Sequence, residues 1–440
     1  MIHIVGGGLA GSECAYYLAE HGVKVVLYEM RPQINTEAHS TAGLAELVCS
    51  NSLRSDELAT GPGLLKAELA DLKSLVMEAA RSTRVPAGKA LAVNRELFSG
   101  FITARIEAHP NITMVRKEIE SLDDPALAGA EYVVIASGPL TSGSLSREIA
   151  KILGEEHLYF YDAIAPIISA DSVNMEKAFW GGRYLPENTD YLNCPFTEEE
   201  YHRFCEALLT GEKTPARDFE KEIHFEGCMP IEVMAERGRM TLAFGPFKPV
   251  GFVDPRTGER PFAIMQLRAE DINKTTFNLV GCQTKLTYPE QRRIFRMVPG
   301  LEEAEFVRFG SMHRNTYVNA PAALGDDLSL KQRPGVFMAG QITGVEGYLE
   351  SAACGLWLGM LLAARKKGVL LEFPPVETAL GGLLNHLKKQ DGGFQPSNIH
   401  FGLLPELGRK MRKAERKAAY AERARESFAA WLSRLPAGWK

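Results

Sequence analysis

Residues 2–11 read IHIVGGGLAG, and this stretch decides the fold. Its four leading residues form a short apolar run typical of a buried strand, glycines interrupt that run, and an amphipathic helical pattern then continues to about residue 21. A second apolar run, residues 23–28, finishes at Glu29. A strand, a glycine turn, a helix and a second strand in this order predict the βαβ unit of a dinucleotide-binding fold.

The glycines have separate physical roles in such a unit. Gly6 makes the tight turn, Gly8 lets the backbone approach a pyrophosphate, and Gly11 allows the helix to pack closely. Glu29 follows Gly11 by eighteen residues, the spacing of a carboxylate that binds an unphosphorylated ribose. A plain glycine-rich turn is the alternative, but the flanking strand, helix and acid favour a dinucleotide site. The predicted binding residues are Gly6, Gly7, Gly8, Leu9, Ala10, Gly11 and Glu29.

Two later apolar segments favour FAD over NAD. They read YVVIASGP at residues 132–139 and GVFMAGQ at residues 335–341. In flavoproteins of the glutathione-reductase type, which these features resemble, one such strand ends beside the cofactor and a late one returns the chain to the first sheet. We therefore expect Gly138, Gly340 and Gln341 to contact FAD, although many of these flavoproteins carry Asp where Gln341 stands.

A glycine loop, ITGVEGYLE, follows Gln341 and opens a strongly helical run at about residues 349–367. Free backbone N–H groups and the positive end of the helix dipole can then face the flavin pyrimidine edge and stabilise an anionic reduced flavin. Gly347 and Tyr348 are the predicted contacts. The alternative is an ordinary helix start.

The predicted fold class is α/β, with a Rossmann-type FAD-binding domain of the glutathione-reductase superfamily and an inserted α+β domain. Residues 1–165 and 330–440 are assigned to the FAD domain, and residues 166–329 to the inserted substrate domain. Within the insert, the patterns predict helices at 197–209 and 288–297 and strands at 261–267 and 277–280.

The composition is that of a folded globular protein: 440 residues, of which 45% are hydrophobic and 24% charged. No run approaches 18 uncharged apolar residues, and Met1 leads directly into a strand pattern, so we expect a cytoplasmic protein without membrane contact. The 7 cysteines are an odd number without a C-x-x-C pair or a neighbouring His cluster, which argues against disulfides and a bound metal. The oligomeric state stays open.

The charge is unevenly distributed along the chain. The net charge of −5 combines +7 in residues 409–440 with −12 in the remainder. The segment 408–435 is rich in Ala, Lys, Arg and Glu and is predicted to form one exposed helix. Such a basic helix can contact a nucleic acid, and the alternative is a solvated surface helix.

Two cysteines stand apart by their context. Cys49 lies in a polar turn, ELVCSNSL, after a short apolar run and near the start of an expected helix, a setting that can favour a thiolate. Cys228 lies between Gly and Pro, just before a helix expected to begin at Ile231. For each, the alternative interpretation is a packed core cysteine.

Longer stretches of the sequence resemble the folate- and FAD-dependent tRNA (uracil-5-)-methyltransferases, in order and from the first strand to beyond FQP at residues 394–396. They include AGLAELVCSNSL (42–53), GLLKAEL (63–69), SLVMEAA (74–80), VPAG (85–88), YLNCP (191–195), GPFKPVG (245–251), MHRNTY (312–317) and GVEGYLES (344–351). The pattern departs at Asn94, where Asp is expected; Asn also caps helices, so the departure alters local charge more than function.

The resemblance implies an enzyme that methylates C5 of a uridine in RNA, most directly the T-loop uridine of tRNA. Methylenetetrahydrofolate supplies the carbon, and FAD reduced by NAD(P)H supplies the hydride. The two cysteines of the family fall on Cys228 and Cys49. A thiolate that adds to uracil C6 makes C5 nucleophilic, and a base then removes the C5 proton. We assign the first role to Cys228 and the second to Cys49, and the roles could be exchanged.

Folate has a pterin ring that stacks and glutamates that need cations, so His313, Arg314 and Tyr348 are candidate folate contacts. Three other functions are considered. A ribosomal RNA uridine would require similar chemistry. A related enzyme that installs carboxymethylaminomethyl groups on wobble uridines is much longer than this chain. A flavin-carrying RNA-binding module without catalysis is disfavoured by the presence of both Cys49 and Cys228.

Overall fold

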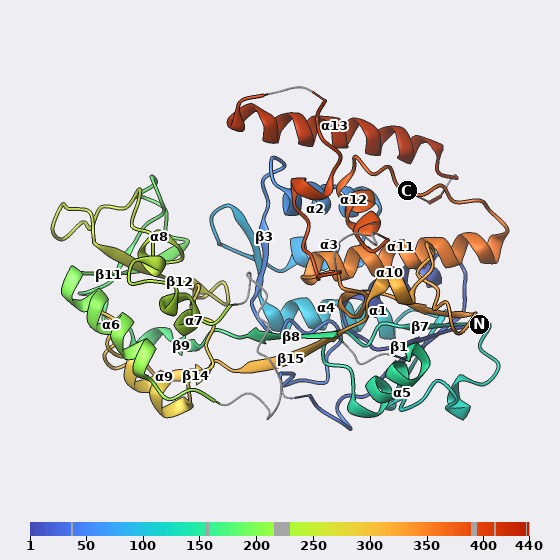
Figure 1. The fold of residues 1–440 in the computed structure, drawn as a ribbon, viewed down its shortest axis with the longest axis horizontal. Coiled ribbons are helices and arrows are strands. Elements are labelled where there is room, and N and C mark those ends of the chain that lie inside the picture. Colours follow the sequence, from blue (N-terminus) through green and yellow to red (C-terminus); the bar gives the residue numbers. More distant parts are fainter. Residues whose placement is uncertain are drawn as a thin grey trace.

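The computed structural model describes residues 1–36, 38–154, 158–214, 229–388, 394–408, 411–436 and 438–439. They form two lobes joined by a pair of long strands (Figure 1). The large lobe contains both ends of the chain, and the small lobe is formed by the middle of it.

A five-stranded parallel sheet forms the centre of the large lobe, in the order β16-β7-β1-β2-β6. Its strands are β1 (Ile2–Val5), β2 (Val25–Glu29), β6 (Ile112–Arg116), β7 (Tyr132–Ile135) and β16 (Val336–Met338). The Val- and Ile-rich runs of β1 and β7 are buried because helices cover both faces of such a sheet. The late strand β16 pairs with β7, so the end of the chain returns to the first sheet, and the Rossmann-type α/β fold class is confirmed.

The helices of the large lobe pack on this sheet and on one another. They are α1 (Leu9–Glu20), α2 (Gly61–Asp71), α3 (Leu75–Ser82), α4 (Arg95–Glu107), α5 (Gly143–Leu153), α10 (Ala320–Ala323), α11 (Tyr348–Lys367), α12 (Ala379–His386) and α13 (Lys413–Arg434). Helices α1 and α11 approach closely: a Cβ on Gly355 would lie 2.2 Å from the Ala10 carbonyl oxygen. A small antiparallel sheet, β3 (Ser52–Ser55), β5 (Ala90–Val93) and β4 (Arg84–Val85), completes the lobe.

The small lobe is built on a six-stranded antiparallel sheet in the order β10-β11-β12-β13-β9-β14. The strands are β9 (Ile167–Ser169), β10 (Phe179–Trp180), β11 (Tyr191–Phe196), β12 (Ala263–Ala269), β13 (Thr276–Leu279) and β14 (Phe306–Arg308). The helices are α6 (Glu198–Thr210), α7 (Ile231–Glu236), α8 (Thr241–Phe244) and α9 (Tyr288–Phe295). The two helices and two strands expected here are therefore present, as is the helix that begins at Ile231.

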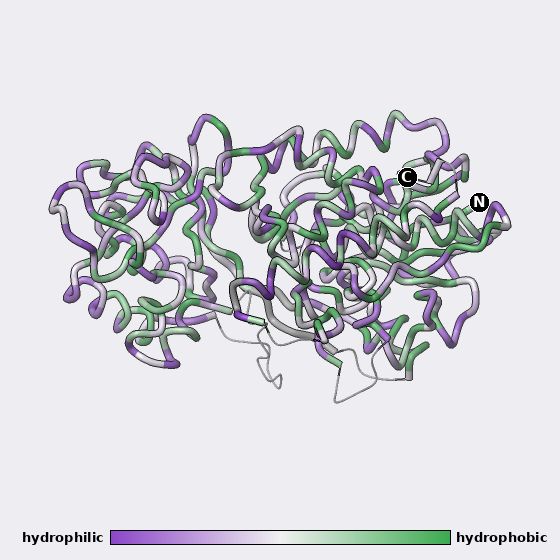
Figure 2. Tube along the Cα trace, turned by 90° about the horizontal axis from the view of Figure 1, so that it is seen from above, coloured by the Kyte–Doolittle hydropathy of each residue, from purple (hydrophilic) through white to green (hydrophobic). Residues whose placement is uncertain are grey.

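Each lobe has its own hydrophobic core, one formed by residues between 2 and 149 and between 318 and 439, the other by residues between 168 and 304. Figure 2 shows long hydrophobic stretches inside the large lobe and hydrophilic segments along the outer edges. The antiparallel pair β8 (Leu158–Ala163) and β15 (Met312–Tyr317) connects the lobes. None of the described helices is both long and apolar enough to cross a membrane.

The C-terminal basic segment forms helix α13, which lies across the top of the large lobe in Figure 1. Its apolar side, with Ala424, Phe428 and Trp431, is buried against the lobe. The indole N–H of Trp431 donates to the backbone oxygen of Glu372 at 3.0 Å. The helix is therefore docked on the fold along one side and exposed along the other.

One local prediction was wrong. The turn at Cys49 leads into strand β3, and the next helix, α2, begins only at Gly61. Strand β3 pairs with β5, and Arg54 within it has a left-handed backbone angle of φ 63°, which a helix excludes. The N-terminus of α2 is fixed by Thr60, whose side chain accepts a hydrogen bond from Gly63 N.

Candidate active site

A deep cleft lies at the carboxyl ends of β1, β2 and β7, where α/β sheets bind their ligands. It encloses about 1010 Å³ together with its open mouth. Its walls include many of the residues predicted to contact a dinucleotide: Gly6, Gly8, Leu9, Ala10, Glu29, Gly138, Gly340, Gln341 and Tyr348.

The three fingerprint glycines occupy the positions expected from their roles. Gly6 has φ 106°, and a Cβ there would lie 2.5 Å from the Ala136 carbonyl oxygen. A Cβ on Gly11 would lie 1.9 Å from the Gly6 carbonyl oxygen, so only glycine lets α1 pack this closely on the turn. A Cβ on Gly8 would meet nothing within 4 Å and would stand in open space beside the cleft, so without a side chain the protein backbone there leaves room for a ligand to come close.

The N-terminus of α1 is available for an anion because no side chain caps it. Gly7 N donates instead to the carboxylate of Glu29, with a distance of 3.0 Å to Oε2. Arg31 binds both oxygens of that carboxylate: its backbone N and Nε donate to Oε1, and its Nη2 donates to Oε2. Burial alone raises the pKa of Glu29, but the bonds and charge of Arg31 outweigh it and leave the pKa below its usual value. Glu29 is therefore an ionised acceptor at the edge of the cleft.

A second hollow of about 990 Å³ continues from the first and shares with it the walls Val48, Pro139, Leu140, Gln341 and Tyr348. The small-lobe side contributes Gln283, and the connecting strand β15 contributes Asn315. The Asn315 side chain is buried, and its Nδ2 has no hydrogen-bond partner within the described part of the chain. The two hollows thus adjoin, one at the glycine turn and the other at the junction between the lobes.

Helix α11 points its N-terminus into this second hollow. Its N-cap, Gly347, has φ 120° and provides no side-chain cap, so the first N–H groups of the helix face the cleft without a capping partner. Gln341 Nε2 donates to Glu346 Oε2 at 2.7 Å, so the residue that replaces the expected Asp is tied to a neighbouring carboxylate.

Cys49 is partly exposed and lines the second hollow. The hydroxyl oxygen of Tyr348, on the first turn of α11, accepts the backbone N–H groups of Cys49 at 2.7 Å and Ser50 at 3.1 Å. Burial raises the pKa of Tyr348, so the phenol stays neutral and keeps a proton to donate. The thiol-bearing turn is thus fixed directly against the helix that faces the cleft.

Three arginines from three different elements hold the same turn, and we call Arg95, Arg268 and Arg308 the arginine clamp. Arg95, from α4, donates to the backbone oxygen of Leu47 at 2.8 Å. Arg308, from β14, donates to the backbone oxygen of Val48 at 2.9 Å.

Arg268, from β12, donates from Nε to Asn51 Oδ1 at 2.9 Å and from Nη2 to Ser50 Oγ at 2.7 Å. Burial and the charge of Arg95 lower the pKa of Arg308, whereas Arg95 itself is paired with Glu270. Because Arg268 and Arg308 belong to the small lobe, the position of Cys49 depends on both lobes.

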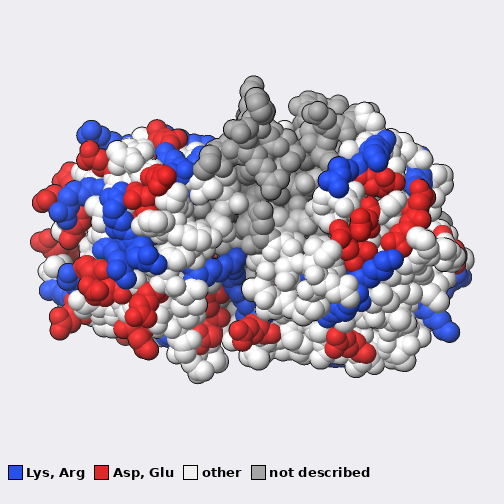
Figure 3. Space-filling model, turned by 90° about the horizontal axis from the view of Figure 1, so that it is seen from below, with Lys and Arg blue, Asp and Glu red and all other residues white. Residues whose placement is uncertain are grey.

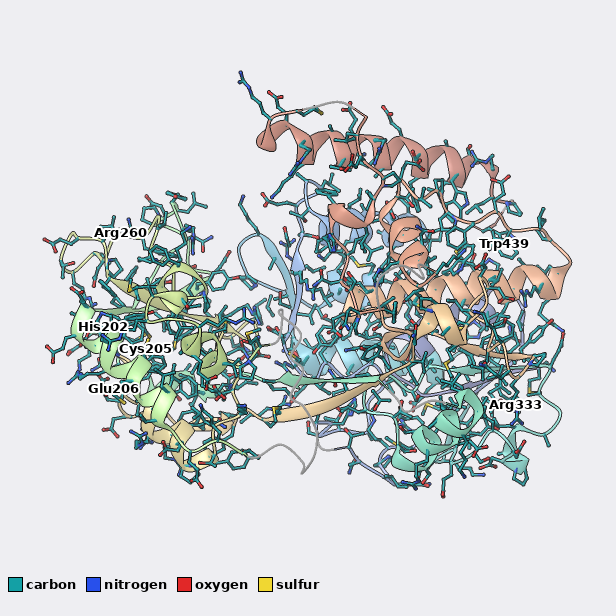
Figure 4. All side chains as sticks on the ribbon, in the orientation of Figure 1. His202, Cys205, Glu206, Arg260, Arg333 and Trp439 are labelled. Carbon is teal, nitrogen blue, oxygen red and sulfur yellow. The ribbon has the colours of Figure 1, made fainter. Side chains whose placement is uncertain are left out.

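The other cysteines of the described residues are free thiols buried in the structure: Cys14, Cys194, Cys205, Cys282 and Cys354. Burial raises the pKa of Cys354 to about 11 and that of Cys194 to about 12, so neither is a ready nucleophile. Cys205 lies on α6 at the outer side of the small lobe (Figure 4).

The remaining predicted residues have mixed outcomes. Cys228 lies outside the described residues. His313 and Arg314 belong to strand β15, and their side chains are also outside the described part. Asn94 caps α4, since its side chain accepts a hydrogen bond from Leu97 N at 3.1 Å. No cluster of metal-ligating side chains occurs among the described residues. The arginine clamp was not predicted, because no local motif marks its members.

Comparison with known proteins places this chain in a family. The family model described as glucose inhibited division protein A matches residues 1–369. A protein of Oleidesulfovibrio alaskensis named methylenetetrahydrofolate–tRNA-(uracil-5-)-methyltransferase TrmFO is 68% identical over 434 residues, 99% of this chain and 97% of that protein. This chain belongs to that methyltransferase family. The resemblance noted in the sequence is confirmed, and so is the prediction of an enzyme.

A more distant member and a solved structure of similar fold extend the comparison. The Aquifex aeolicus protein of the same name is 54% identical over 430 residues, covering 98% of this chain and 96% of that protein. The solved structure of Aquifex aeolicus GidA in its form II crystal has a TM-score of 0.69 with 16% identity, covering 100% of this chain and 74% of that one. At 16% identity, the similarity to GidA supports the fold of this chain and says nothing about its activity.

Proposed function

We propose that this enzyme methylates C5 of a uridine in RNA, with the T-loop uridine of tRNA as the preferred target. Methylenetetrahydrofolate would give the carbon, and FAD reduced by NAD(P)H would give the hydride. The names of the relatives support the substrate and the carbon donor. The observation that carries the proposal is that the hollow at a dinucleotide-type glycine turn adjoins, through shared walls, the hollow lined by the partly exposed thiol of Cys49.

The residues of the cleft fit FAD. The uncapped N-terminus of α1 and the open face of Gly8 suit a pyrophosphate, and Glu29 suits the ribose hydroxyls. The uncapped N-terminus of α11, beginning at Gly347, suits an electron-rich ring edge. When bound and reduced, FAD supplies the hydride that completes the methyl group.

We further propose separate roles for the two thiols, Cys228 as the group that adds to uracil C6 and Cys49 as the group that moves the C5 proton, with the exchanged assignment as the alternative. Cys49 suits proton transfer because its turn is held rigidly and its side chain lines the cleft. The neutral hydroxyl of Tyr348, on the same wall, can hold a substrate oxygen by donating a hydrogen bond to it. His313, Arg314 and Tyr348 remain the proposed folate contacts.

The proposed domains follow the two cores. Residues 1–165 and 330–440 would form the FAD domain, and residues 166–329 the inserted domain that presents RNA to the cleft. The separate hydrophobic cores of the lobes support this division.

A trapping experiment tests the thiol chemistry. A tRNA stem-loop that contains 5-fluorouridine should become covalently attached, because the fluorine cannot leave as the C5 proton does. Cys228→Ala should abolish the adduct, and Cys205→Ala should leave it intact, because Cys205 is buried on α6 and lines neither hollow of the candidate site. If the adduct survives Cys228→Ala but not Cys49→Ala, the two roles are exchanged. An adduct that survives both single changes would rule out the thiol mechanism.

A reconstitution separates the enzyme from a noncatalytic RNA-binding module. Unmodified tRNA transcript should acquire 5-methyluridine only when methylenetetrahydrofolate and NAD(P)H are both present. Ribosomal RNA fragments, tested beside it, should be poorer substrates. RNA binding without any methylation under these conditions would favour the module.

A further inference from the structure

Three aromatic rings are stacked in a row on the lower side of the small lobe, and we call Phe306, Phe309 and Tyr288 the aromatic ladder. The ring centroids of Phe306 and Phe309 lie 4.9 Å apart with planes at 9°. Those of Phe309 and Tyr288 lie 4.7 Å apart with planes at 15°. Such regular parallel stacking leaves the outer face of the last ring in the geometry that another flat ring would adopt.

The ladder is rigid at its inner end and open at its outer end. Phe306 packs against the fully buried Phe295 of α9, with centroids 6.5 Å apart. Tyr288, at the other end, is 56% exposed. An exposed aromatic ring that is held in place by a stack is a preformed platform, because little side-chain freedom remains to be lost on binding.

Positive charge accompanies the rings. Arg292 follows Tyr288 by one helical turn on α9, and its guanidinium lies 5.3 Å from the centroid of Phe309. Arg292 and Arg293 are both exposed, and Arg293 pairs with the carboxylate of Glu290, so Arg292 supplies the positive charge beside the rings. Figure 3 shows Lys and Arg side chains among acidic ones on the underside of the small lobe, the side on which α9 lies in Figure 1.

The residues next to the ladder in sequence reach the candidate active site. Arg308, between Phe306 and Phe309 in sequence, reaches the backbone oxygen of Val48, which is the residue before Cys49. Strand β15 begins three residues after Phe309 and contributes Asn315 to the cleft wall. Arg308 therefore links the strand on which the ladder begins to the turn that carries the thiol.

We propose that the aromatic ladder is a stacking platform for an unpaired base of the RNA substrate, next to the uridine that is methylated. Stacked aromatic side chains with an adjacent arginine bind single-stranded bases in this way. Tyr288 and Arg292 line neither hollow of the candidate active site, and an exposed ring face suits an RNA loop better than a small molecule, which needs a concave site. This proposal rests on the proposed RNA substrate.

Binding of a fluorescently labelled T-arm stem-loop to the complete, FAD-loaded protein tests the platform. Tyr288→Ala should raise the Kd by about 5- to 150-fold, the range that follows from removing one base–aromatic stack. Tyr288→Phe should stay within about twofold of the wild type, because the ring face remains. Tyr184→Ala is the matched control, since Tyr184 is 70% exposed on the same lobe but is not part of the ladder. The flavin absorbance spectrum should be identical in all four proteins.

Arg292→Gln gives an independent measurement. It should reduce the slope of log affinity against log salt by about 0.7 if the arginine neutralises one phosphate of a single strand. The platform is overturned if the Kd of Tyr288→Ala stays within twofold of the wild type, or if Tyr184→Ala weakens binding equally. If the wild-type protein binds and methylates the stem-loop and Tyr288→Ala does so equally well, the platform proposal is rejected and the proposed function stands. If the wild-type protein binds no RNA, both the platform proposal and the proposed function are rejected.

Discussion

Replacing Arg268 by Gln should slow methylation without preventing RNA or flavin binding. Arg268 is only 7% exposed and makes two hydrogen bonds to the turn that follows Cys49, one to Asn51 Oδ1 and one to Ser50 Oγ. The shorter, neutral glutamine cannot reach both acceptors. Asn51, which is fully buried, would then keep an unpaired oxygen.

The magnitude follows from those two bonds. A hydrogen bond from a charged donor contributes about 1.5–3 kcal/mol, so the two together stabilise the ordered turn by about 3–6 kcal/mol. The hydroxyl of Ser50 can recover a bond from water because Ser50 is partly exposed, so we expect a loss near 3 kcal/mol. A displacement of about 1 Å at a reacting group costs roughly 100-fold in rate, and kcat should fall by about that factor.

The assay measures kcat and KM for a T-arm stem-loop, together with thermal unfolding and the flavin spectrum. Arg296→Gln is the control, because Arg296 also makes two hydrogen bonds within the small lobe, both to the backbone oxygen of Ala304, and none to the turn. A lower kcat with unchanged KM in the Arg268 variant alone supports a positioning role. A kcat within threefold of the wild type, or an equal loss in both variants, would refute this reasoning.

Three further predictions concern the cofactor, the pH dependence and the tail. Gly8→Val should fold normally but lose FAD, because its side chain enters only the open space beside the cleft; retention of heat-releasable FAD by the variant would count against the site. Burial raises the pKa of Glu13 to about 7 and that of Glu68 to about 8, so the folded state holds more protons than the unfolded state between the ordinary carboxyl pKa of 4.5 and these raised values. The free energy of unfolding should therefore decrease as pH rises from about 5 to 8, by at most about 1.4 kcal/mol per pH unit for each group. Denaturant titrations of Glu13→Gln should show a shallower decrease, and an identical slope would contradict it. Neutralising the exposed Arg416 and Lys417 of α13 should flatten the salt dependence of RNA binding by about 0.7–0.9 per charge without loss of FAD, whereas an unchanged slope would leave α13 as a solvated helix.

The parts of the fold that the sequence predicted are those with local causes. The positive φ of Gly6 and the close approach of Gly11 to the Gly6 carbonyl oxygen both lie within residues 6–11, so a short motif is enough to predict the turn and the packing of α1, whereas the contact of Gly6 with Ala136 comes from a distant segment. The apolar runs of β1 and β7 are similarly local, because a strand covered on both faces needs continuous Val and Ile.

The surroundings of Cys49 could not be predicted in the same way. The arginine clamp joins α4, β12 and β14 to one turn, and its hydrogen bonds span 48 to 260 residues of sequence. Arginine is common on protein surfaces, so nothing in the residues near Arg268 marks it as buried. The prediction of a helix after Cys49 was wrong for a similar reason. Pairing of β3 with the distant β5 determines the conformation of that segment, and local propensity does not.

The source of the methyl carbon tests the central claim most directly. The purified protein is incubated with unmodified tRNA transcript, NAD(P)H and methylenetetrahydrofolate labelled with carbon-13 in its methylene group, and the nucleosides are analysed by mass spectrometry. A parallel reaction contains unlabelled folate and adenosylmethionine labelled in its methyl group. We predict that 5-methyluridine carries the label from the folate and none from adenosylmethionine. Label that enters only from adenosylmethionine, or transfer that proceeds without folate, would contradict the account.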